Sequence, residues 1–440
     1  MTFSDYIDYL RGKRIGVIGF GVSNQPLVRV LLRNGCDVTV CDRRERAQLG
    51  AAGDEAAAQG AKFALGADYL EHLDFDVIFR TPGVLPIVPQ LRAAAQNGAI
   101  LTSEMEAFCN LCPCRILAIT GSDGKTTTST ITAELLRAQG YTVHLGGNIG
   151  TPLFDRIPDI RPDDFSVLEL SSFQLHSMHC APDVAIITNI SPNHLDVHPD
   201  FEDYVSAKCS IYRGQRPDGV LVLNARDAHT PRFAAEAPGS VRYFSSIGPV
   251  ENGVYCSDGV IYRVHGGEAE KLIDVSDIRI PGAHNVENYM AAFAATDGLV
   301  GQAACVQVAR SFAGVPHRME RIRELNGITF INDSIASSPT RTIAGLHALP
   351  KPPVIILGGI YSGVVTPTEA ACASVFYALF VSLFIYKSMT LKELPGVLVA
   401  TTKGMVPMLF VATCAIVFAR VLSMLQAPQM LSNAVLSPLS

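Results

Sequence analysis

The chain has 440 residues with a formal net charge of −6, and 48% of its residues are hydrophobic. This length allows about two to four domains with hydrophobic cores of their own. A negative net charge without any run of Lys or Arg excludes the basic surface of a typical nucleic-acid-binding protein, so we expect no nucleic-acid partner.

The N-terminus and the cysteines favour a domain that stays in a reducing compartment. Met1 to Asp5 carry no basic segment before an apolar run, so we expect no signal peptide. The eleven cysteines follow no disulfide-framework spacing. Cys109, Cys112 and Cys114 lie close together, but no second pair has a matching spacing. We therefore interpret them as linker or core residues rather than as a metal site.

Residues 1–110 alternate strands and helices in the way that is typical of a parallel sheet. Short β-branched runs predict strands at Arg14–Gly19, Asp37–Cys41 and Asp76–Arg80, with helices between them. We therefore expect a Rossmann-like α/β domain.

The turn after the first predicted strand resembles a dinucleotide-binding fingerprint. Gly19 and Gly21 stand in this turn, and Asp42 follows about twenty residues later. Asn24 stands where the fingerprint has its third glycine. An NAD(P)-dependent enzyme is therefore one open interpretation, and tight NAD(H) binding would support it.

Residues 111–315 begin the same pattern again and predict a second α/β domain, of the P-loop ATPase type. Strands are expected at Ile116–Thr120, Ser166–Leu170, Val184–Asn189 and Gly219–Leu223. A glycine-rich loop joins the first of these strands to a helix.

This loop predicts a phosphate-binding site. Its glycines let backbone N–H groups close around phosphate oxygens, and the helix N-terminus adds a favourable dipole. Lys125 neutralises phosphate charge, and the Thr126 hydroxyl holds Mg²⁺. Ile119 stands where a Walker A loop has its first glycine, and the alternative is an exposed Gly/Ser turn. The predicted ATP-binding residues of the loop are Gly121, Ser122, Asp123, Gly124, Lys125, Thr126 and Thr127.

Four later segments follow the loop in an order that resembles the Mur ligases. They are Gly147–Gly150, Glu169–Leu175, Thr188–Asp196, and Ala207-Lys208 with Ile211-Tyr212. The second segment is similar to the D-glutamate-adding branch of that family. The resemblance covers about four-fifths of the chain, up to Gly359.

The resemblance implies an ATP-dependent amide ligase of peptidoglycan synthesis in the cytoplasm. Such an enzyme uses ATP and two Mg²⁺ ions to activate UDP-N-acetylmuramoyl-L-alanine as an acyl phosphate, from which the amine of D-glutamate displaces phosphate. Positioning and charge neutralisation supply much of this catalysis. The family implies a monomer.

By the same resemblance, the metal ligands are Thr126, Glu169, His194 and a carbamylated Lys208. Glu169 also ends a predicted strand, where ligands gather in doubly wound sheets. Without the resemblance, His194 would be a structural histidine and Lys208 a surface lysine. The residues implied in catalysis are Lys125, Glu169, His194, Lys208 and Arg318.

The resemblance also implies the binding residues of both nucleotides. Asn285 and Asn288 lie near the adenine, although helix capping is an alternative for one of them. Arg318 clamps the ATP phosphates, Asp333 binds ribose, and Ile335 stands where many relatives have lysine. The implied UDP-substrate residues are Gly19, Gly21, Val22, Ser23, Asp42, Arg43, Thr81, Pro82, Gly83, Asn148, Ser171 and His194.

Residues 316–359 predict the start of a third Rossmann-like domain. A strand at Ile328–Asn332, a helix at Pro339–Leu349 and a strand at Val354–Leu357 are expected. A parallel sheet of two strands leaves its faces uncovered, so we expect a truncated domain that is an aggregation liability and impairs ligation.

Residues 360–440 resemble a fragment of the large membrane subunit of TRAP-type dicarboxylate transporters. The stretches 370–386 and 405–418 are apolar all round, which favours helices at the inner membrane over buried core helices. A transporter fragment fused to a nucleotide-binding module is therefore a second open interpretation. A joining artefact or a degraded gene fusion explains the loss of the amino-acid pocket better than a membrane-tethered ligase does. Genomic sequencing across codons 358–362 distinguishes the artefact.

Overall fold

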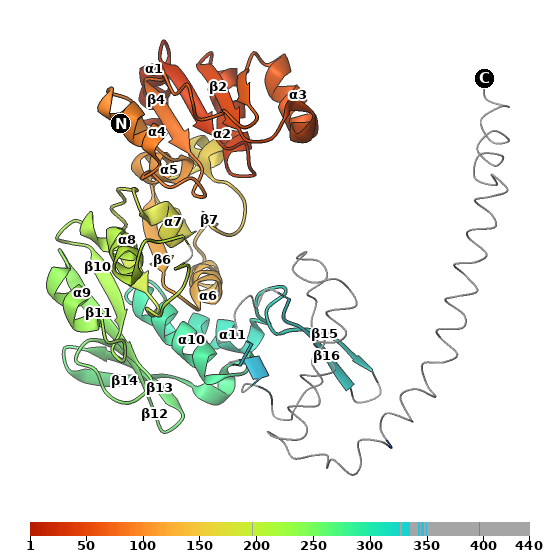
Figure 1. Cartoon of the computed structure of the whole chain (residues 1–440). Coiled ribbons are helices and arrows are strands. Elements are labelled where there is room, and N and C mark those ends of the chain that lie inside the picture. The colour runs from red at the N-terminus through yellow and green to blue at the C-terminus, as the bar shows by residue number, and fades with distance from the viewer. Residues whose placement is uncertain are drawn as a thin grey trace. The chain divides into compact units, whose positions relative to one another are not determined.

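The computed structural model describes residues 1–195, 197–325 and 328–334, followed only by residues 342, 343, 345, 346, 349 and 396. The chain divides into one compact unit at Met1–Pro352 and another at Pro353–Ser440, and every element named below belongs to the first (Figure 1). The predicted strand Val354–Leu357, residue Ile335 and both apolar stretches of the tail lie outside the described residues. Most of the predicted helix Pro339–Leu349 does too.

The first sheet is wholly parallel, as the sequence predicts. Its order is β3-β2-β1-β4-β5, which places β1 at the centre. The sequence predicts β1, β2 and β4 but not β3 and β5, which are short and only half-buried or exposed. The strands are β1 (Arg14–Ile18), β2 (Asp37–Asp42), β3 (Lys62–Leu65), β4 (Val77–Arg80) and β5 (Ile100–Thr102).

Five α-helices and a 3₁₀ turn accompany the first sheet in the described part of the chain. They are α1 (Phe3–Leu10), α2 (Asn24–Arg33), η1 (Arg46–Leu49), α3 (Gly50–Ala58), α4 (Pro89–Gln96) and α5 (Glu104–Leu111). Pro89 begins α4, where its fixed φ suits a first helical turn and its missing N–H costs nothing. Helix α5 connects the first sheet to the second.

The second sheet is mixed rather than purely parallel. Its order is β14-β13-β12-β11-β10-β9-β6-β8-β7, with parallel pairing from β7 to β12 and antiparallel pairing of β13 and β14. The sequence predicts β6, β8, β9 and β10 only. The strands are β6 (Arg115–Thr120), β7 (Val143–Gly147), β8 (Phe165–Glu169), β9 (Val184–Ile187), β10 (Val220–Asn224), β11 (Ser240–Ser245), β12 (Gly253–Ser257), β13 (Val260–His265) and β14 (Glu268–Asp274).

Helix α10 (Ala283–Ala295) packs against α6 (Lys125–Ala138) and β11. The segment Tyr289–Ala295 is fully buried, and four of its seven residues are alanines. Small side chains let the helix approach both neighbours closely. The remaining helical elements are η2 (Phe154–Asp159), α7 (Ser172–Leu175), α8 (Phe201–Arg213), α9 (Thr230–Glu236), η3 (Val275–Asp277) and α11 (Gln302–Ser311).

The third sheet of the described chain is an antiparallel hairpin of β15 (Glu320–Leu325) and β16 (Ile328–Asn332). The sequence predicts β16 but not β15, and the predicted parallel partner of β16, Val354–Leu357, lies outside the described residues, so that pairing stays a prediction. Four of the six residues of β15 are charged and five are exposed, so the strand lies at the surface. Ile322, Ile328 and Phe330 remain largely exposed on the hairpin. Within the described part of the chain, no helix is both long and apolar enough to cross a bilayer.

The cysteine cluster lies where α5 meets β6. Cys112 and Cys114 place their sulfur atoms 3.5 Å apart, and both sulfurs contact the hydroxyl of Ser166. None of the three clustered cysteines belongs to a group of side chains that could hold a metal ion among the described residues.

A single apolar cluster runs from the first sheet through α5 and η2 to the second sheet, and Glu104 of α5 is buried beside it. A Glu104 carboxylate oxygen accepts the Phe154 N–H at 3.2 Å, and the side chain is only 4% exposed. Burial raises the pKa of Glu104 from 4.5 to about 7 despite this hydrogen bond. Between about pH 4.5 and pH 7, Glu104 therefore keeps a proton in the folded protein that it loses in the unfolded chain.

Because the folded-state pKa is the higher one, stability falls as the pH rises from about 4.5 through about 7. We expect Glu104→Gln, which keeps an acceptor for the Phe154 N–H, to remove this loss. The free energy of unfolding of the variant, relative to the native chain, should rise by on the order of 2 kcal/mol between pH 5 and pH 8. Urea unfolding at each pH measures this difference.

Glu134→Gln is the matched control, because Glu134 is an exposed carboxylate on α6 that pairs with Arg137. Its free-energy difference should stay nearly flat over the same range. An equally flat profile for Glu104→Gln would contradict the expected proton uptake.

Candidate active site

The loop between β6 and α6 depends on two glycines. Gly121 has φ +144° and Gly124 has φ +80°. A Cβ atom would run into the Thr188 hydroxyl at Gly121 and into the Asn288 side-chain oxygen at Gly124. The N–H groups of Ser122 and Asp123 donate to Asn189, at 2.9 and 3.0 Å. Segments far apart in the sequence thus fix the loop in one shape.

Lys125 lies at the start of α6 with its ammonium group turned back into the loop. Its Nζ donates to the carbonyl oxygens of Gly121 at 2.8 Å and Ser122 at 2.9 Å. The first N–H groups of a helix have no intrahelical acceptor, so α6 also directs partial positive charge at the loop. Phosphate oxygens are the ligands that such an arrangement favours.

Glu169, at the end of β8, is 1% exposed. Its Oε1 accepts from the Asn148 side chain at 2.9 Å, whereas its Oε2 has no hydrogen-bond partner within the described part of the chain. A buried carboxylate oxygen without a partner is costly unless a cation or a donor meets it. A Mg²⁺ ion, which prefers oxygen ligands, fits this position.

Lys208 of α8 is also buried, at 1% exposure. Its Nζ donates to the Gly121 carbonyl at 2.8 Å and lies 4.6 Å from the centre of the Tyr204 ring. Burial holds the pKa of Lys208 well below its usual range, and the charge of Lys125 lowers it further, while Asp123 and Glu169 oppose the shift. The structure thus brings Lys125, Glu169 and Lys208 around one loop.

His194 stands on an exposed loop after β9, with φ +54°. Its ring meets the Phe173 ring of α7 edge-on, with the centroids 5.0 Å apart. Phe173 lies two residues after Ser171. Ser171 itself is the N-cap of α7: its hydroxyl accepts the Gln174 N–H at 3.3 Å. The predicted ligand His194 therefore lies beside the segment that follows Glu169.

A cavity of about 290 Å³ opens next to the phosphate loop. Its lining includes five predicted ATP-site residues, and also several that the sequence analysis did not single out. The predicted ones are Asp123, Gly124, Asn288, Arg318 and Asp333. The additional ones are Thr188, Asn189, Phe244, His284, Glu287, Ala291, Met319 and Gly345. Phe244 lies on β11, a strand that the sequence did not predict.

Asn285 does not line this cavity. Its side chain donates to the Pro281 carbonyl at 2.6 Å and accepts from the Asn288 side chain at 3.2 Å. Asn288 in turn accepts from the Thr128 hydroxyl. Asn285 therefore orients Asn288, which favours a local structural role for one asparagine of the pair.

Burial, reinforced by Arg318, lowers the pKa of His284 on the cavity wall.

The turns after β1 and β4 lie together in the first sheet. A Cβ atom at Gly19 would contact the Thr81 side chain, so the predicted UDP-site residues Gly19 and Thr81 are neighbours. The Asn24 side chain donates to the Gly19 carbonyl at 2.8 Å and is buried. Asn24, which stands where a dinucleotide fingerprint has its third glycine, thus ties the start of α2 to this turn. Val22, Ser23, Arg43 and Gly83 are exposed around these turns, and Pro82 is half-buried.

Asp42 binds the protein rather than facing solvent. Its carboxylate accepts the Phe20 N–H at 2.7 Å and the Arg44 guanidinium at 2.9 Å. Burial opposes ionisation, but these hydrogen bonds lower the pKa of Asp42 to about 2. The sequence analysis named Arg43 and missed Arg44, because only the folded structure shows which of the two turns back to Asp42.

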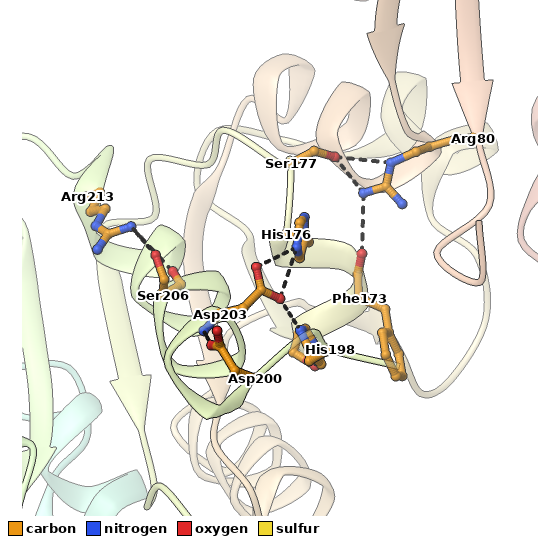
Figure 2. A network of polar contacts seen from close by, with 10 residues as sticks. Arg80, Phe173, His176, Ser177, His198, Asp200, Asp203, Ser206 and Arg213 are labelled. Carbon is orange, nitrogen blue, oxygen red and sulfur yellow. Dashed lines mark hydrogen bonds and ion pairs between the residues drawn. The ribbon is translucent and has the colours of Figure 1, made fainter. Parts of the chain in front are cut away.

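A histidine–aspartate cluster lies between α7 and α8 (Figure 2). His198 and His176 contact the Asp203 carboxylate, at 2.7 and 3.1 Å, and the second ring nitrogen of His198 meets the Ser172 hydroxyl at 3.0 Å. In the described part of the chain, His176, His198 and Asp203 are the one group of three or more His, Cys, Asp or Glu side chains whose ligand atoms all lie within 4.8 Å of one another. Hydrogen bonding to the shared carboxylate accounts for their spacing.

Two known families match parts of the chain. Residues 119–296 match the Mur ligase middle domain, and residues 322–439 match the DctM component of the tripartite ATP-independent periplasmic transporters. The second match begins well before Gly359, so the join between the two resemblances is less sharp than the sequence analysis places it.

Curated proteins similar to the chain are D-glutamate-adding ligases. The UDP-N-acetylmuramoylalanine–D-glutamate ligase of Acetivibrio thermocellus is 46% identical over 357 residues, which cover 81% of this chain and 77% of that protein. The ligase of the same name from Clostridium botulinum strain 657 is 45% identical over 359 residues, which cover 81% of this chain and 78% of that protein.

Similar solved structures include the UDP-N-acetylmuramate-alanine ligase MurC of Thermotoga maritima, with a TM-score of 0.47 and 20% identity, covering 76% of this chain and 77% of that one. The UDP-N-acetylmuramate:L-alanyl-gamma-D-glutamyl-meso-diaminopimelate ligase of Neisseria meningitides has a TM-score of 0.47 and 19% identity. The match covers 69% of this chain and 99% of that one.

The phosphate loop gives a direct test of the cavity. We expect Gly124→Ala to lower the affinity for ATP at least about tenfold, because its new Cβ displaces Asn288 and the loop. Gly35→Ala is the control, since Gly35 has a similar φ of +77° but no atom within 4 Å of a new Cβ. Both variants carry a backbone cost of about 1 kcal/mol. Calorimetric titration with a non-hydrolysable ATP analogue measures the affinities, and equal losses in both variants would contradict this role.

Proposed function

Since the chain belongs to the Mur ligase family, as an ATP-dependent ligase of the type that adds D-glutamate in peptidoglycan synthesis, we propose how its residues divide that reaction. The observation that carries the proposal is the unpartnered, buried Oε2 of Glu169 beside a loop that already holds Lys125 and Lys208. This combination suits a site that receives a metal-bound triphosphate and a substrate carboxylate together.

The reaction has two steps. The carboxylate of UDP-N-acetylmuramoyl-L-alanine attacks the γ-phosphorus of ATP, so ADP leaves and an acyl phosphate forms. The amine of D-glutamate then attacks the acyl carbon, and inorganic phosphate leaves from the tetrahedral intermediate as the amide forms. In this proposal Lys125 exchanges its loop carbonyls for phosphate oxygens. The N-terminus of α6 stabilises the same negative charge.

The proposed metal ligands are Thr126, Glu169, His194 and Lys208, which would hold two Mg²⁺ ions. When bound, Mg²⁺ neutralises the triphosphate and lets a carboxylate approach it. Glu169 fits this role because its Oε2 lacks a protein donor in the described chain. Lys208 requires a chemical change first, since an ammonium group repels a cation.

We propose that Lys208 is carbamylated. A neutral amine attacks CO₂ and loses one proton, which gives an anionic carbamate with two oxygen ligands. The buried Lys208 favours this reaction, because burial lowers its pKa and leaves the amine neutral at a higher fraction. The sequence alone did not distinguish this residue from a surface lysine.

The remaining residues bind the two nucleotides. Asn288, Arg318 and Asp333 bind ATP from the cavity wall, and Asn285 holds Asn288 in place. The turns at Gly19–Ser23 and Thr81–Gly83, together with Asp42, bind the UDP end of the substrate, while Asn148 lies at the acid end. The ligase relatives favour a UDP-sugar over NAD(P) in the first sheet. We place the ligase part in the cytoplasm, as a monomer.

We expect the incomplete third domain to impair acyl phosphate formation less than it impairs ligation. The segment that follows β16 matches a transporter family, whereas the ligase relatives continue beyond the part they share with this chain. A transporter fragment carrying a nucleotide-binding module is therefore the second candidate. Membrane association of the tail belongs to this second proposal.

Phosphate release separates the two candidates. We expect phosphate release from ATP to depend on both UDP-N-acetylmuramoyl-L-alanine and D-glutamate. Lys208→Met should lower its rate by about 100-fold, as for the loss of a charge-stabilising group. Lys271→Met is the control, because Lys271 is exposed and pairs with Asp274. Slow phosphate release that ignores the UDP-substrate would favour the transporter-linked module.

Carbamylation has a test that does not depend on turnover. The native protein equilibrated with ¹³C-labelled CO₂ should show one carbamate resonance in ¹³C NMR that Lys208→Met removes. Acidification should abolish the resonance, since protonation of the amine withdraws the reactive form. A resonance that persists in Lys208→Met would assign the carbamate to another amine.

A further inference from the structure

Arg80 is the last residue of β4 and immediately precedes the turn Thr81–Gly83. Its side chain is 2% exposed, which is rare for arginine. It points away from the first sheet towards α7, as Figure 2 shows. Arg80 is not one of the site residues discussed above.

The guanidinium group uses all of its donor directions. Nη1 donates to the carbonyl oxygens of Thr81 at 3.4 Å and Val84 at 3.2 Å, which holds the turn after β4 from inside. Nη2 donates to the Phe173 carbonyl at 3.3 Å, and Nε donates to the Ser177 hydroxyl at 3.0 Å. A second bond from Nη2 reaches the same hydroxyl at 2.5 Å. One side chain thereby ties two distant chain segments together.

All of these partners are neutral. Burial lowers the pKa of Arg80 to about 10, and the more distant Glu106 carboxylate opposes this shift. Burying a charge without a paired carboxylate is costly, and an apolar side chain of the same length would avoid that cost. The gain from Arg80 is therefore geometric, because a rigid planar fork fixes the distance between its acceptors.

The segment on the far side leads directly to the phosphoryl-transfer site. Glu169 lies four residues before Phe173, and Ser171 caps the short helix α7, which carries Phe173. On the opposite side, His176 and His198 both contact Asp203 of α8, the helix that carries Lys208. The stretch 171–177 is therefore held between Arg80, which precedes the substrate turn, and Asp203 of the helix that carries Lys208 (Figure 2).

We propose that Arg80 is a positioning residue that sets the spacing between the turn binding the UDP end of the substrate and the site that phosphorylates its acid end. This inference rests on the proposed function. A carboxylate must lie within about 3–3.5 Å of the atom that it attacks, and a displacement of about 1 Å costs on the order of 100-fold in rate. A fixed link between the two ends of a long substrate meets that requirement.

The test compares Arg80→Met and Arg80→Lys with the native chain. Arg14→Met is the control, because Arg14 is an exposed arginine of the same sheet that pairs with Asp74 and Asp76. The first readout is kcat and KM for phosphate release that depends on UDP-N-acetylmuramoyl-L-alanine, with D-glutamate present. We expect Arg80→Met to lower kcat about 100-fold while the KM for ATP changes less than about threefold. Arg80→Lys should retain part of the rate, because a lysine at this position can still make some of these hydrogen bonds, although fewer than arginine.

The second readout is amide hydrogen exchange with and without the UDP-substrate. In the native chain, the substrate should slow exchange in both 81–84 and 171–179; in Arg80→Met, it should slow exchange in 81–84 only. Protection that still reaches 171–179 in Arg80→Met, or an unchanged kcat, would overturn the role of Arg80. If the native chain itself fails to bind the UDP-substrate, the proposed function fails, and this role fails with it.

Discussion

The phosphate loop brings together buried groups that do not satisfy one another. Glu169 presents a carboxylate oxygen without a partner in the described chain, and Lys208 presents an amine whose main acceptor is a loop carbonyl. Two strands, β6 and β8, and two helices, α6 and α8, converge to hold these groups in place. In the function proposed above, a triphosphate and its cations would complete the missing interactions and make this burial tolerable. The fold around them serves mainly to keep that set of groups fixed.

Sequence patterns predicted the strands that are buried on both faces. β1, β4, β6, β8 and β9 are runs of apolar, often β-branched residues, and turn residues bound them clearly. The strands that were missed, such as β11 and the meander β12 to β14, mix polar and apolar residues. The meander strands pair with their sequence neighbours through the turns Asp258-Gly259 and Gly266-Gly267, which are hairpin signals that the sequence analysis did not use. β15 was missed because four of its six residues are charged, which is also typical of a solvent-exposed loop.

The site was predictable where one short segment carries the chemistry. The residues of the phosphate loop follow from glycine positions and the strand–helix context, and Glu169 follows from its place at a strand end. Other residues depend on the tertiary fold: Phe244 reaches the cavity from an unpredicted strand, and Asn285 supports Asn288 instead of lining the cavity. Asn24 departs from the dinucleotide pattern, and its hydrogen bonds to the first turn give that departure a structural reason.

The alanine-rich stretch of α10 has a consequence for how the protein tolerates inherited variation. Ala291, Ala292, Ala294 and Ala295 are completely or almost completely enclosed, so even one added methylene group has no room. The same helix carries Asn288, whose side-chain oxygen stands directly over Gly124. A bulkier residue in this helix would therefore shift a nucleotide-site residue from several ångströms away. Evolutionary change in this part of the chain is constrained by steric volume as strictly as by chemistry.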